Sequence, residues 1–284
     1  MPRKYGLCSN MFASFLAGLF LTACQSRGLA GSPLAPTMRP IVAVAGQAPV
    51  VLVAQGQPRV TVVIPDERGK DILMNYGKPF KEDVCELAAQ ELVRHVALIT
   101  GAKLPVVKAR DFTGGPAVYL GVSAAAAKAG FLPDDSLPPE GFSVVVKDGS
   151  LAIIGPDREK YYVTGANGQP VHEPEIDSTG TLFGVYDVLE RFLGVRWYWP
   201  TDELGTIAPR AAGLAVPAVS YADWPRYQFR SLWPEGANPA HWADVGPNPR
   251  LFYKRWRYGM GSAFFSGHSY GRWGELYATR HPEY

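Results

Sequence analysis

Aromatic and basic side chains in the last third of the sequence are the groups best able to do chemistry. The chain has 7 Trp and 14 Tyr, and these residues concentrate after Trp197. Arg230 carries a forked guanidinium that suits bidentate capture of a carboxylate, and His268 in a Gly-His-Ser turn offers a hydrogen bond. Flat amphipathic rings stack on ligands, and three tryptophans accompany these residues: Trp233, Trp256 and Trp273. The sequence predicts that Arg230, Trp233 and His268 contact a bound ligand.

Each of these residues also has a structural explanation that the sequence leaves open. Arg230 would pair with an acid at a domain interface, and His268 would be a loop histidine without a function. Tryptophans at this density would pack as interface core. The acids nearest to the expected strand at Arg230 are Glu235, Asp244 and Glu275. Each is predicted to be a surface or loop carboxylate, so no catalytic acid is assigned.

The sequence holds few signs of a metal or cofactor site. The sequence has no P-loop, no GxGxxG after a strand, no HExxH and no paired CxxC. A polar stretch over 158–178 fits neither the helical nor the strand period, and it holds four possible ligands: His172, Glu173, Glu175 and Asp177. Such groups on a surface loop are usually solvated, so we expect no metal and no cofactor. The net charge of +2 gives no basic field for nucleic acid.

The N-terminus predicts export. Arg3 and Lys4 precede an apolar run of 13 residues, Met11 to Ala23, which is shorter than the roughly 20 residues of a spanning helix. It ends in Leu-Thr-Ala-Cys24, which resembles the lipobox of bacterial lipoproteins, where the cysteine is lipidated. The alternative is a plain secretory signal with Cys24 incidental. Residues 1–24 are therefore predicted to be a lipoprotein signal peptide. Gln25, not Asp, follows the cysteine, so by resemblance to the sorting rule we expect the outer membrane as the address.

Residues 25–58 are predicted to be a flexible tether, because they are rich in Gly, Ala, Pro and Gln and hold only Arg27 and Arg39 as charges. The alternative is a hairpin of Ile41 to Val44 and Val50 to Val53 that docks on the domain. Once Cys8 leaves with the signal and Cys24 is lipidated, Cys85 has no disulfide partner. We expect it to be a small core residue.

From Arg59 the pattern predicts an α/β unit. Two amphipathic helices are expected, at Lys81 to Thr100 and at Thr181 to Phe192, each followed by a glycine that ends it. Asp148-Gly149 predicts a hairpin, and the expected strands are Arg59 to Ile64, Leu104 to Val107, Ala117 to Gly121, Phe142 to Val146, Leu151 to Ile154 and Val195 to Trp199. This alternation predicts the α/β class, with a mixed sheet and packed helices over residues 59–222.

Beyond Asp202 the chain is predicted to change character. Prolines at 209, 217 and 225 indicate a connector between domains. Tyr227 to Trp233 is expected to be a new strand, and Ala240 to Tyr258 to hold a helix. Residues 223–284 are therefore assigned to a second region.

Two stretches carry a family resemblance. Lys81 to Val106 (KEDVCELAAQELVRHVALITGAKLPV) and Thr181 to Pro200 (TLFGVYDVLERFLGVRWYWP) resemble the N-terminal domain of alpha-glucuronidases of glycoside hydrolase family 67. The same layout precedes the catalytic barrel of beta-N-acetylhexosaminidase-type enzymes and of a group of mostly secreted proteins. The tail is similar to the start of that group's barrel at Phe229-Arg230, Trp256-Arg257, Gly267-His268-Ser269 and His281 to Tyr284.

The resemblance implies that residues 223–284 begin a (β/α)₈-type barrel. Such a barrel needs about 250 residues, whereas 58 residues run from Tyr227 to Tyr284. We therefore expect a truncated barrel start, with the two catalytic carboxyls of a glycoside hydrolase beyond Tyr284. The alternative is a complete small lipoprotein whose aromatic tail packs back on the domain.

The resemblance also gives the expected function. It implies an exported glycoside hydrolase-like protein acting on polysaccharides or uronic-acid-bearing glycans, with Arg230, Trp233 and His268 as sugar contacts. Its expected partners are a carbohydrate and, through the lipid on Cys24, a membrane. The alternatives are a surface glycan-binding lipoprotein without turnover and a structural envelope protein.

Overall fold

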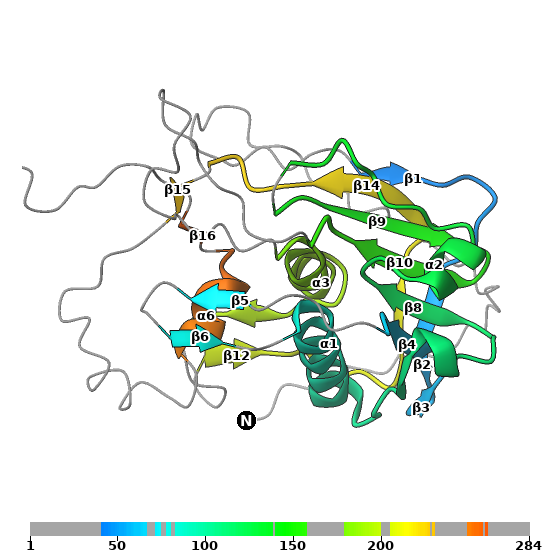
Figure 1. Ribbon diagram of the computed structural model, residues 1–284. Coiled ribbons are helices and arrows are strands. Elements are labelled where there is room, and N and C mark those ends of the chain that lie inside the picture. Colours follow the sequence, from blue (N-terminus) through cyan, green and yellow to red (C-terminus); the bar gives the residue numbers. More distant parts are fainter. Residues whose placement is uncertain are drawn as a thin grey trace, which may run out of the picture. The chain divides into compact units, whose positions relative to one another are not determined.

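A seven-stranded mixed sheet is the centre of the fold in the computed structural model (Figure 1). Four strands are mutually parallel in the order β10-β8-β4-β7, and β9, β14 and β1 extend the sheet with antiparallel pairings. The strands in spatial order are β1 (Val42–Ala43), β14 (Val219–Asp223), β9 (Phe142–Lys147), β10 (Ser150–Ile154), β8 (Ala117–Leu120), β4 (Thr61–Ile64) and β7 (Val106–Lys108). The predicted α/β class with a mixed sheet and packed helices is confirmed.

The structure describes residues 41–66, 72–74, 78–80, 83–138, 140–157, 179–199, 205–227, 229–230, 249–257 and 259–260. Several sequence predictions therefore lie outside the described residues: the signal segment 1–24 with Cys24, the polar stretch 158–178, Trp233, His268 and Trp273. None of the described helices is long and apolar enough to cross a bilayer.

Two long helices cover one face of the sheet (Figure 1). Helix α1 (Val84–Thr100) begins at Asp83, whose carboxylate accepts the N–H groups of Cys85 at 2.8 Å and Glu86 at 3.1 Å. It ends at Gly101, which has a φ of 78° as the left-handed cap requires. Helix α3 (Gly180–Arg191) lies beside it. Both helices confirm the predictions made from their apolar period.

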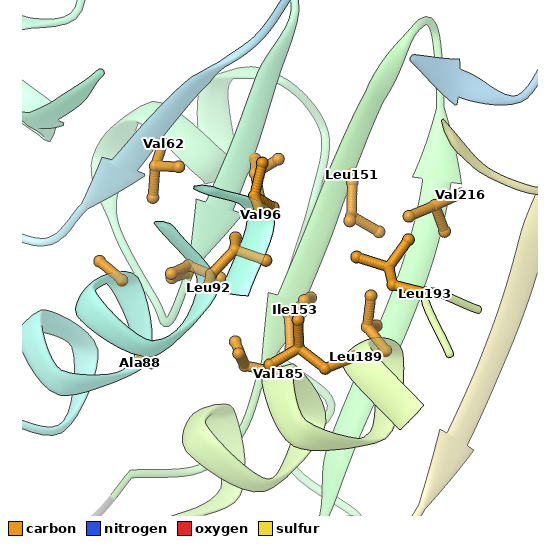
Figure 2. Packing of buried hydrophobic residues seen from close by; sticks show 14 of the residues in the cluster. Val62, Ala88, Leu92, Val96, Leu151, Ile153, Val185, Leu189, Leu193 and Val216 are labelled. Atoms are coloured by element: carbon orange, nitrogen blue, oxygen red, sulfur yellow. The ribbon is translucent and has the colours of Figure 1, made fainter. Parts of the chain in front are cut away.

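The main core lies between this sheet face and the two helices. Figure 2 shows Leu92 and Val96 of α1 and Val185 of α3 turned toward side chains of the strands. One face of β9 points into this core. Its residues Phe142, Val144 and Val146 are therefore buried, while the residues between them are half-buried.

The opposite sheet face carries a smaller apolar cluster. It is covered by the short helix α2 (Ala124–Lys128), which Ser123 caps through the N–H of Ala126 at 3.1 Å, and by Phe131. The 3-10 turn η1 (Ala109–Asp111) contacts α2. Strand β10 is buried along its whole length, since it lies under both clusters.

The predicted β9–β10 hairpin is confirmed. Asp148 and Gly149 have φ values of 49° and 73°, the left-handed conformations that a two-residue type I′ turn needs. The remaining elements form small sheets and one helix: β2 (Val50–Ala54), β3 (Gln57–Pro58), β5 (Ile72–Met74), β6 (Lys78–Phe80), β11 (Arg196–Trp197), β12 (Thr206–Ile207), β13 (Leu214–Val216), β15 (Phe229–Arg230), α6 (Pro249–Arg255) and β16 (Gly259–Met260).

The structure differs from the predicted tether over the described part of 25–58. Strand β1 pairs with β14 in the main sheet, and β2 pairs with β13 and β3. The alternative hairpin is also wrong in its pairing, because β1 and β2 belong to different sheets. Leu52 and Val53 are buried while Val51 is 44% exposed, so this apolar segment is part of the core.

The predicted connector after Asp202 is likewise wrong. Its described residues supply β12, β13 and β14, with Pro209 and Pro217 between strands, where no ladder hydrogen bond is lost. Described residues on both sides of the predicted boundary at 222/223 fall in one compact unit, Arg39–Tyr284; the boundary itself stays a prediction. Cys85 is free and buried in the main core, as predicted.

Candidate functional site

The C-terminal end of α3 positions a short aromatic strand. The helix ends at Phe192, and Gly194, with a φ of 73°, reverses the chain into β11. The N–H of Val195 returns to the carbonyl of Leu189 at 2.9 Å, which fixes the turn. Consecutive residues of a strand point to opposite sides, so Trp197 is 3% exposed while Tyr198 is 62% exposed.

Trp197 is anchored by a buried histidine of α1. Its indole N–H donates to Nε2 of His95 at 3.0 Å, and Nδ1 of His95 lies 2.7 Å from the carbonyl of Glu91. Because Nε2 accepts, the proton sits on Nδ1 and the ring is neutral. Burial lowers the pKa of His95 to about 4.

A buried ion pair joins helix α6 to the same network. The guanidinium of Arg255 donates to both carboxylate oxygens of Glu91, at 2.8 and 3.1 Å, and both side chains are 3% exposed. The same guanidinium lies over the ring of Trp197, 5.8 Å from its centroid. Helix α6 is thereby held beside β11.

The docking of α6 completes a pocket of about 200 Å³ whose lining residues are Glu190, Arg196, Trp197, Tyr198, Trp256 and Arg257. Trp256 is 51% exposed, and its indole N–H donates to the carbonyl of Trp197 at 2.9 Å. Two partly exposed aromatic rings are therefore presented at one site, and one of them is held by a hydrogen bond.

Charged groups line the pocket between these rings. Arg257 pairs with the carboxylate of Glu190, while Nη1 of Arg196 donates to the carbonyls of Glu190 at 2.6 Å and Val195 at 2.7 Å. Concave sites with aromatic walls and a few placed polar groups are typical of small-molecule binding. This arrangement suits an amphipathic ligand that has an apolar face and polar or acidic substituents.

Of the predicted contacts, Arg230 is the one among the described residues. Its guanidinium donates to Glu140 at 2.6 Å, to the carbonyl of Arg257 at 2.6 Å, and to the carbonyl of Tyr227. This is the ion pair that the sequence left open as the alternative for Arg230. One of its two carbonyl partners, that of Arg257, belongs to a residue that lines the pocket, so Arg230 lies next to the site. A sugar contact by Arg230 stays a prediction.

The sequence interpretation missed most of the pocket. The sequence offered Trp256 as a stacking residue, with interface core as the alternative; the structure places it among the lining residues of the pocket, and stacking on a ligand stays a prediction. Glu190, Arg196, Tyr198 and Arg257 were not predicted. The signal available for two of them was the Arg-Trp-Tyr-Trp-Pro run, in which consecutive residues of a strand point to opposite faces, so Arg196 and Tyr198 lie on the face opposite the buried Trp197.

A second polar cluster lies where the parallel strands end. Asp157 follows β10 and accepts the backbone N–H of Thr181 at 3.0 Å together with its hydroxyl, and the thiol of Cys85 lies 3.8 Å from it. Burial raises the pKa of Asp157 to about 6 against the lowering effect of these hydrogen bonds. These contacts explain the cluster as a cap for α3. Among the described residues, no group of three or more His, Cys, Asp or Glu could hold a metal.

The sequence matches no protein-family model and no curated protein. Among solved structures, the chain is similar to a family GH115 4-O-methyl-alpha-glucuronidase with specificity for decorated arabinogalactans, at 19% identity and a TM-score of 0.39 over 63% of this chain and 19% of that chain. It is also similar to the GH20 beta-N-acetylhexosaminidase of Streptomyces coelicolor A3(2), at 14% identity and a TM-score of 0.38 over 67% of this chain and 26% of that chain.

A third similar structure is the beta-N-acetylhexosaminidase of Bacteroides fragilis NCTC 9343, at 15% identity and a TM-score of 0.32 over 69% of this chain and 25% of that chain. The chain thus spans between 19% and 26% of the length of these three structures. The structural neighbours are glycoside hydrolases. Any activity of this chain is a proposal.

Proposed function

We propose that this chain is the accessory α/β domain and barrel start of an exported glycoside hydrolase-like protein acting on polysaccharides or uronic-acid-bearing glycans, and that its pocket binds carbohydrate. The observation that carries the proposal is the joint presence of exposed Tyr198 and Trp256 with paired and anchored charges in one pocket. The resemblance of the sequence to the alpha-glucuronidase N-terminal domain supports it.

The physical match is to a sugar ring. A pyranose has an apolar face of C–H groups, which packs on an aromatic ring, and an edge of hydroxyls, which needs hydrogen-bonding partners. Trp256 and Tyr198 offer the rings, whereas Glu190 and Arg196 offer an acceptor and donors. Covering part of such a ring with an apolar sugar face is favourable, because burying apolar surface gains about 25 cal/mol per Å².

One observation favours binding without turnover as a second candidate function. Glycoside hydrolysis uses two carboxyl groups on either side of the scissile bond. Glu190 is the one carboxylate among the residues that line this pocket, and it is paired with Arg257. The pocket is therefore proposed to hold a glycan, and any hydrolysis is assigned to carboxyls outside it.

The experiment for this proposal is glycan-array binding followed by calorimetry with the full chain. We expect at least one polysaccharide fragment to bind, and Trp256→Ala to weaken it about tenfold or more, in line with the 2 kcal/mol or so of a central aromatic contact. Tyr227→Ala is the matched control, because Tyr227 is 76% exposed and is not among the lining residues. Absence of any glycan ligand would leave the structural envelope protein as the explanation.

The membrane anchor is a separate part of the proposal. Lipidation of Cys24 would hold the chain on the envelope, since the apolar run Met11 to Ala23, 13 residues long, is too short to span a bilayer. Cys24→Ser should then move the chain from the membrane fraction to the soluble fraction and abolish labelling with a fatty acid analogue. Unchanged labelling would contradict the assignment.

A further inference from the structure

Arg196 is held at the pocket by the end of helix α3. Its Nη1 group donates to the carbonyl of Glu190, in the last turn of the helix, and to the carbonyl of Val195. The last carbonyls of a helix have no partner within the helix and are commonly satisfied by a basic side chain. This bond therefore fixes the guanidinium of an exposed arginine that also lines the pocket.

The capping bonds use only one nitrogen of that guanidinium. Both hydrogen bonds of the Arg196 side chain come from Nη1, and within the described part of the chain neither Nε nor Nη2 has a partner. Nε–H and Nη2–H lie side by side on one edge of the planar group. This edge is one of the forks that match both oxygens of a carboxylate.

The other charges of the pocket do not oppose an anion. The lining holds two arginines and one glutamate, so it carries a net positive charge. The carboxylate of Glu190 is already paired with Arg257. An incoming carboxylate would therefore meet the fork of Arg196 and a glutamate whose charge is offset.

We infer that Arg196 is a specificity-determining residue, which binds the carboxylate of a uronic acid residue while the sugar ring stacks on Trp256 or Tyr198. This inference rests on the proposed function, because it assumes that the pocket holds a glycan. It adds that the α/β domain itself selects acidic over neutral sugars. The fork matches the oxygens of carboxylates and of tetrahedral oxyanions alike. A carboxylate should bind more tightly than a sulfate ester because it is the more basic anion and therefore the stronger hydrogen-bond acceptor.

The test uses the full chain and three probes: an oligouronide, its fully methyl-esterified form, and a sulfated neutral oligosaccharide of similar length. The acid and its ester differ in charge at the group that Arg196 is proposed to bind. Charged hydrogen bonds contribute enough for about a tenfold preference, so the acid should bind about tenfold more tightly than the ester. The sulfated probe should bind more weakly than the acid.

Variants separate recognition from helix capping. Arg196→Gln should remove the preference for the acid, so affinity for the acid should fall about tenfold more than affinity for the ester. Arg196→Lys keeps the charge and a donor for the helix carbonyls but has no fork, so its preference should be intermediate. Arg210→Gln is the matched control, since it removes the same charge from an exposed arginine that does not line the pocket. Thermal unfolding checks that each variant is folded.

Each other outcome counts against a defined claim. Equal affinity for acid and ester, or an equal loss of both in Arg196→Gln, would overturn the role of Arg196 and leave glycan binding intact. Tighter binding of the sulfated probe would overturn the carboxylate assignment. If neither acid nor ester binds, the inference fails. If, in addition, no glycan of the array binds or Trp256→Ala leaves the affinity for a bound glycan unchanged, the proposed function fails as well.

Discussion

Helix α3 is closely packed at its first turn, whereas its last turn ends beside a pocket with exposed rings. A Cβ added to Gly180 would lie 2.1 Å from the carbonyl oxygen of Gly141, and one added to Gly155 would lie 2.4 Å from the backbone nitrogen of Thr181. At the other end, Tyr198 and Trp256 are more than half exposed. The first turn is therefore fixed closely against its neighbours, while the last turn borders the pocket proposed to bind a ligand.

The two ends also bury titratable groups of opposite kind. Near the first turn, burial raises the pKa of Asp157 to about 6, which favours the neutral acid. Near the last turn, burial lowers the pKa of His95 to about 4, which favours the neutral imidazole. In both cases burial favours the neutral form. The free energy of unfolding should therefore depend on pH in opposite directions through Asp157 and through His95.

The largest expected effect comes from the buried ion pair of Glu91 and Arg255 beside the pocket. Glu91→Gln removes the charge that compensates Arg255, and both side chains are 3% exposed. Breaking a buried pair from one side costs about 3–5 kcal/mol. The free energy of unfolding, measured in urea, should fall by this amount, and the proposed glycan binding should be lost because α6 is no longer held.

An exposed pair is the control for this variant. Lys108 and Glu86 are joined at 2.7 Å, but their side chains are 25% and 41% exposed. Glu86→Gln should cost less than about 1 kcal/mol. A similar cost for both variants would mean that burial of the Glu91 pair does not matter, and would remove the support for α6 as the element that holds Trp256 and Arg257 at the pocket.

The next effect is a pair of opposed pH dependences. The folded state holds the His95 proton less tightly than the unfolded state does, so this contribution to stability is complete above pH 6.5 and is lost as the pH falls toward about 4. The folded state holds the Asp157 proton more tightly, so its contribution is complete below pH 3.8 and is lost as the pH rises through about 6. Each change is worth up to about 3 kcal/mol.

Substitutions separate these two contributions. Asp157→Asn keeps a capping group and removes the acid, so relative to the original chain its stability should increase with pH between about 4 and 6. His95→Gln should show the reverse trend over the same interval. Urea unfolding at several pH values measures both, and parallel pH curves for the two variants would show that these groups do not titrate as the structure implies.

A contrast between local and distant contacts explains how much of the fold the sequence could predict. Both long helices and the Asp148-Gly149 turn depend on neighbouring residues, so apolar period, caps and turn chemistry were sufficient. Strand β1 was missed because Val42 pairs with Ser220 across most of the chain. Such a partner cannot be identified from local pattern, and a segment with few charges was taken for a tether.

The candidate site was only partly predictable for a similar reason. Trp256 was noticed as an aromatic residue, but its place in the pocket depends on a hydrogen bond to Trp197, 59 residues earlier in the chain. The buried pair of Arg255 and Glu91 spans 164 residues. Residue type indicated a possible ligand contact, whereas the docking of α6 decided which residues meet.

A smaller effect is expected from the packed end of α3. Gly180→Ala places a methyl group against the backbone of Gly141, where a flexible side chain cannot give way. Overpacking of this kind costs about 1–3 kcal/mol, which thermal or urea unfolding would detect. A loss of less than about 0.5 kcal/mol would show that the close approach to Gly141 relaxes freely.

The smallest effect on stability should come from Tyr198→Ala at the open end. Its side chain is 62% exposed, and substitutions at such positions usually change the free energy of unfolding by less than about 0.5 kcal/mol. If the pocket binds a glycan as proposed, affinity should nevertheless fall severalfold, because the exposed ring lines the pocket and is not part of the core. A loss of more than about 1.5 kcal/mol in urea would instead place Tyr198 with the packed aromatics such as Trp197. The open end of α3 would then be part of the core, and the pocket would lose one of its two rings.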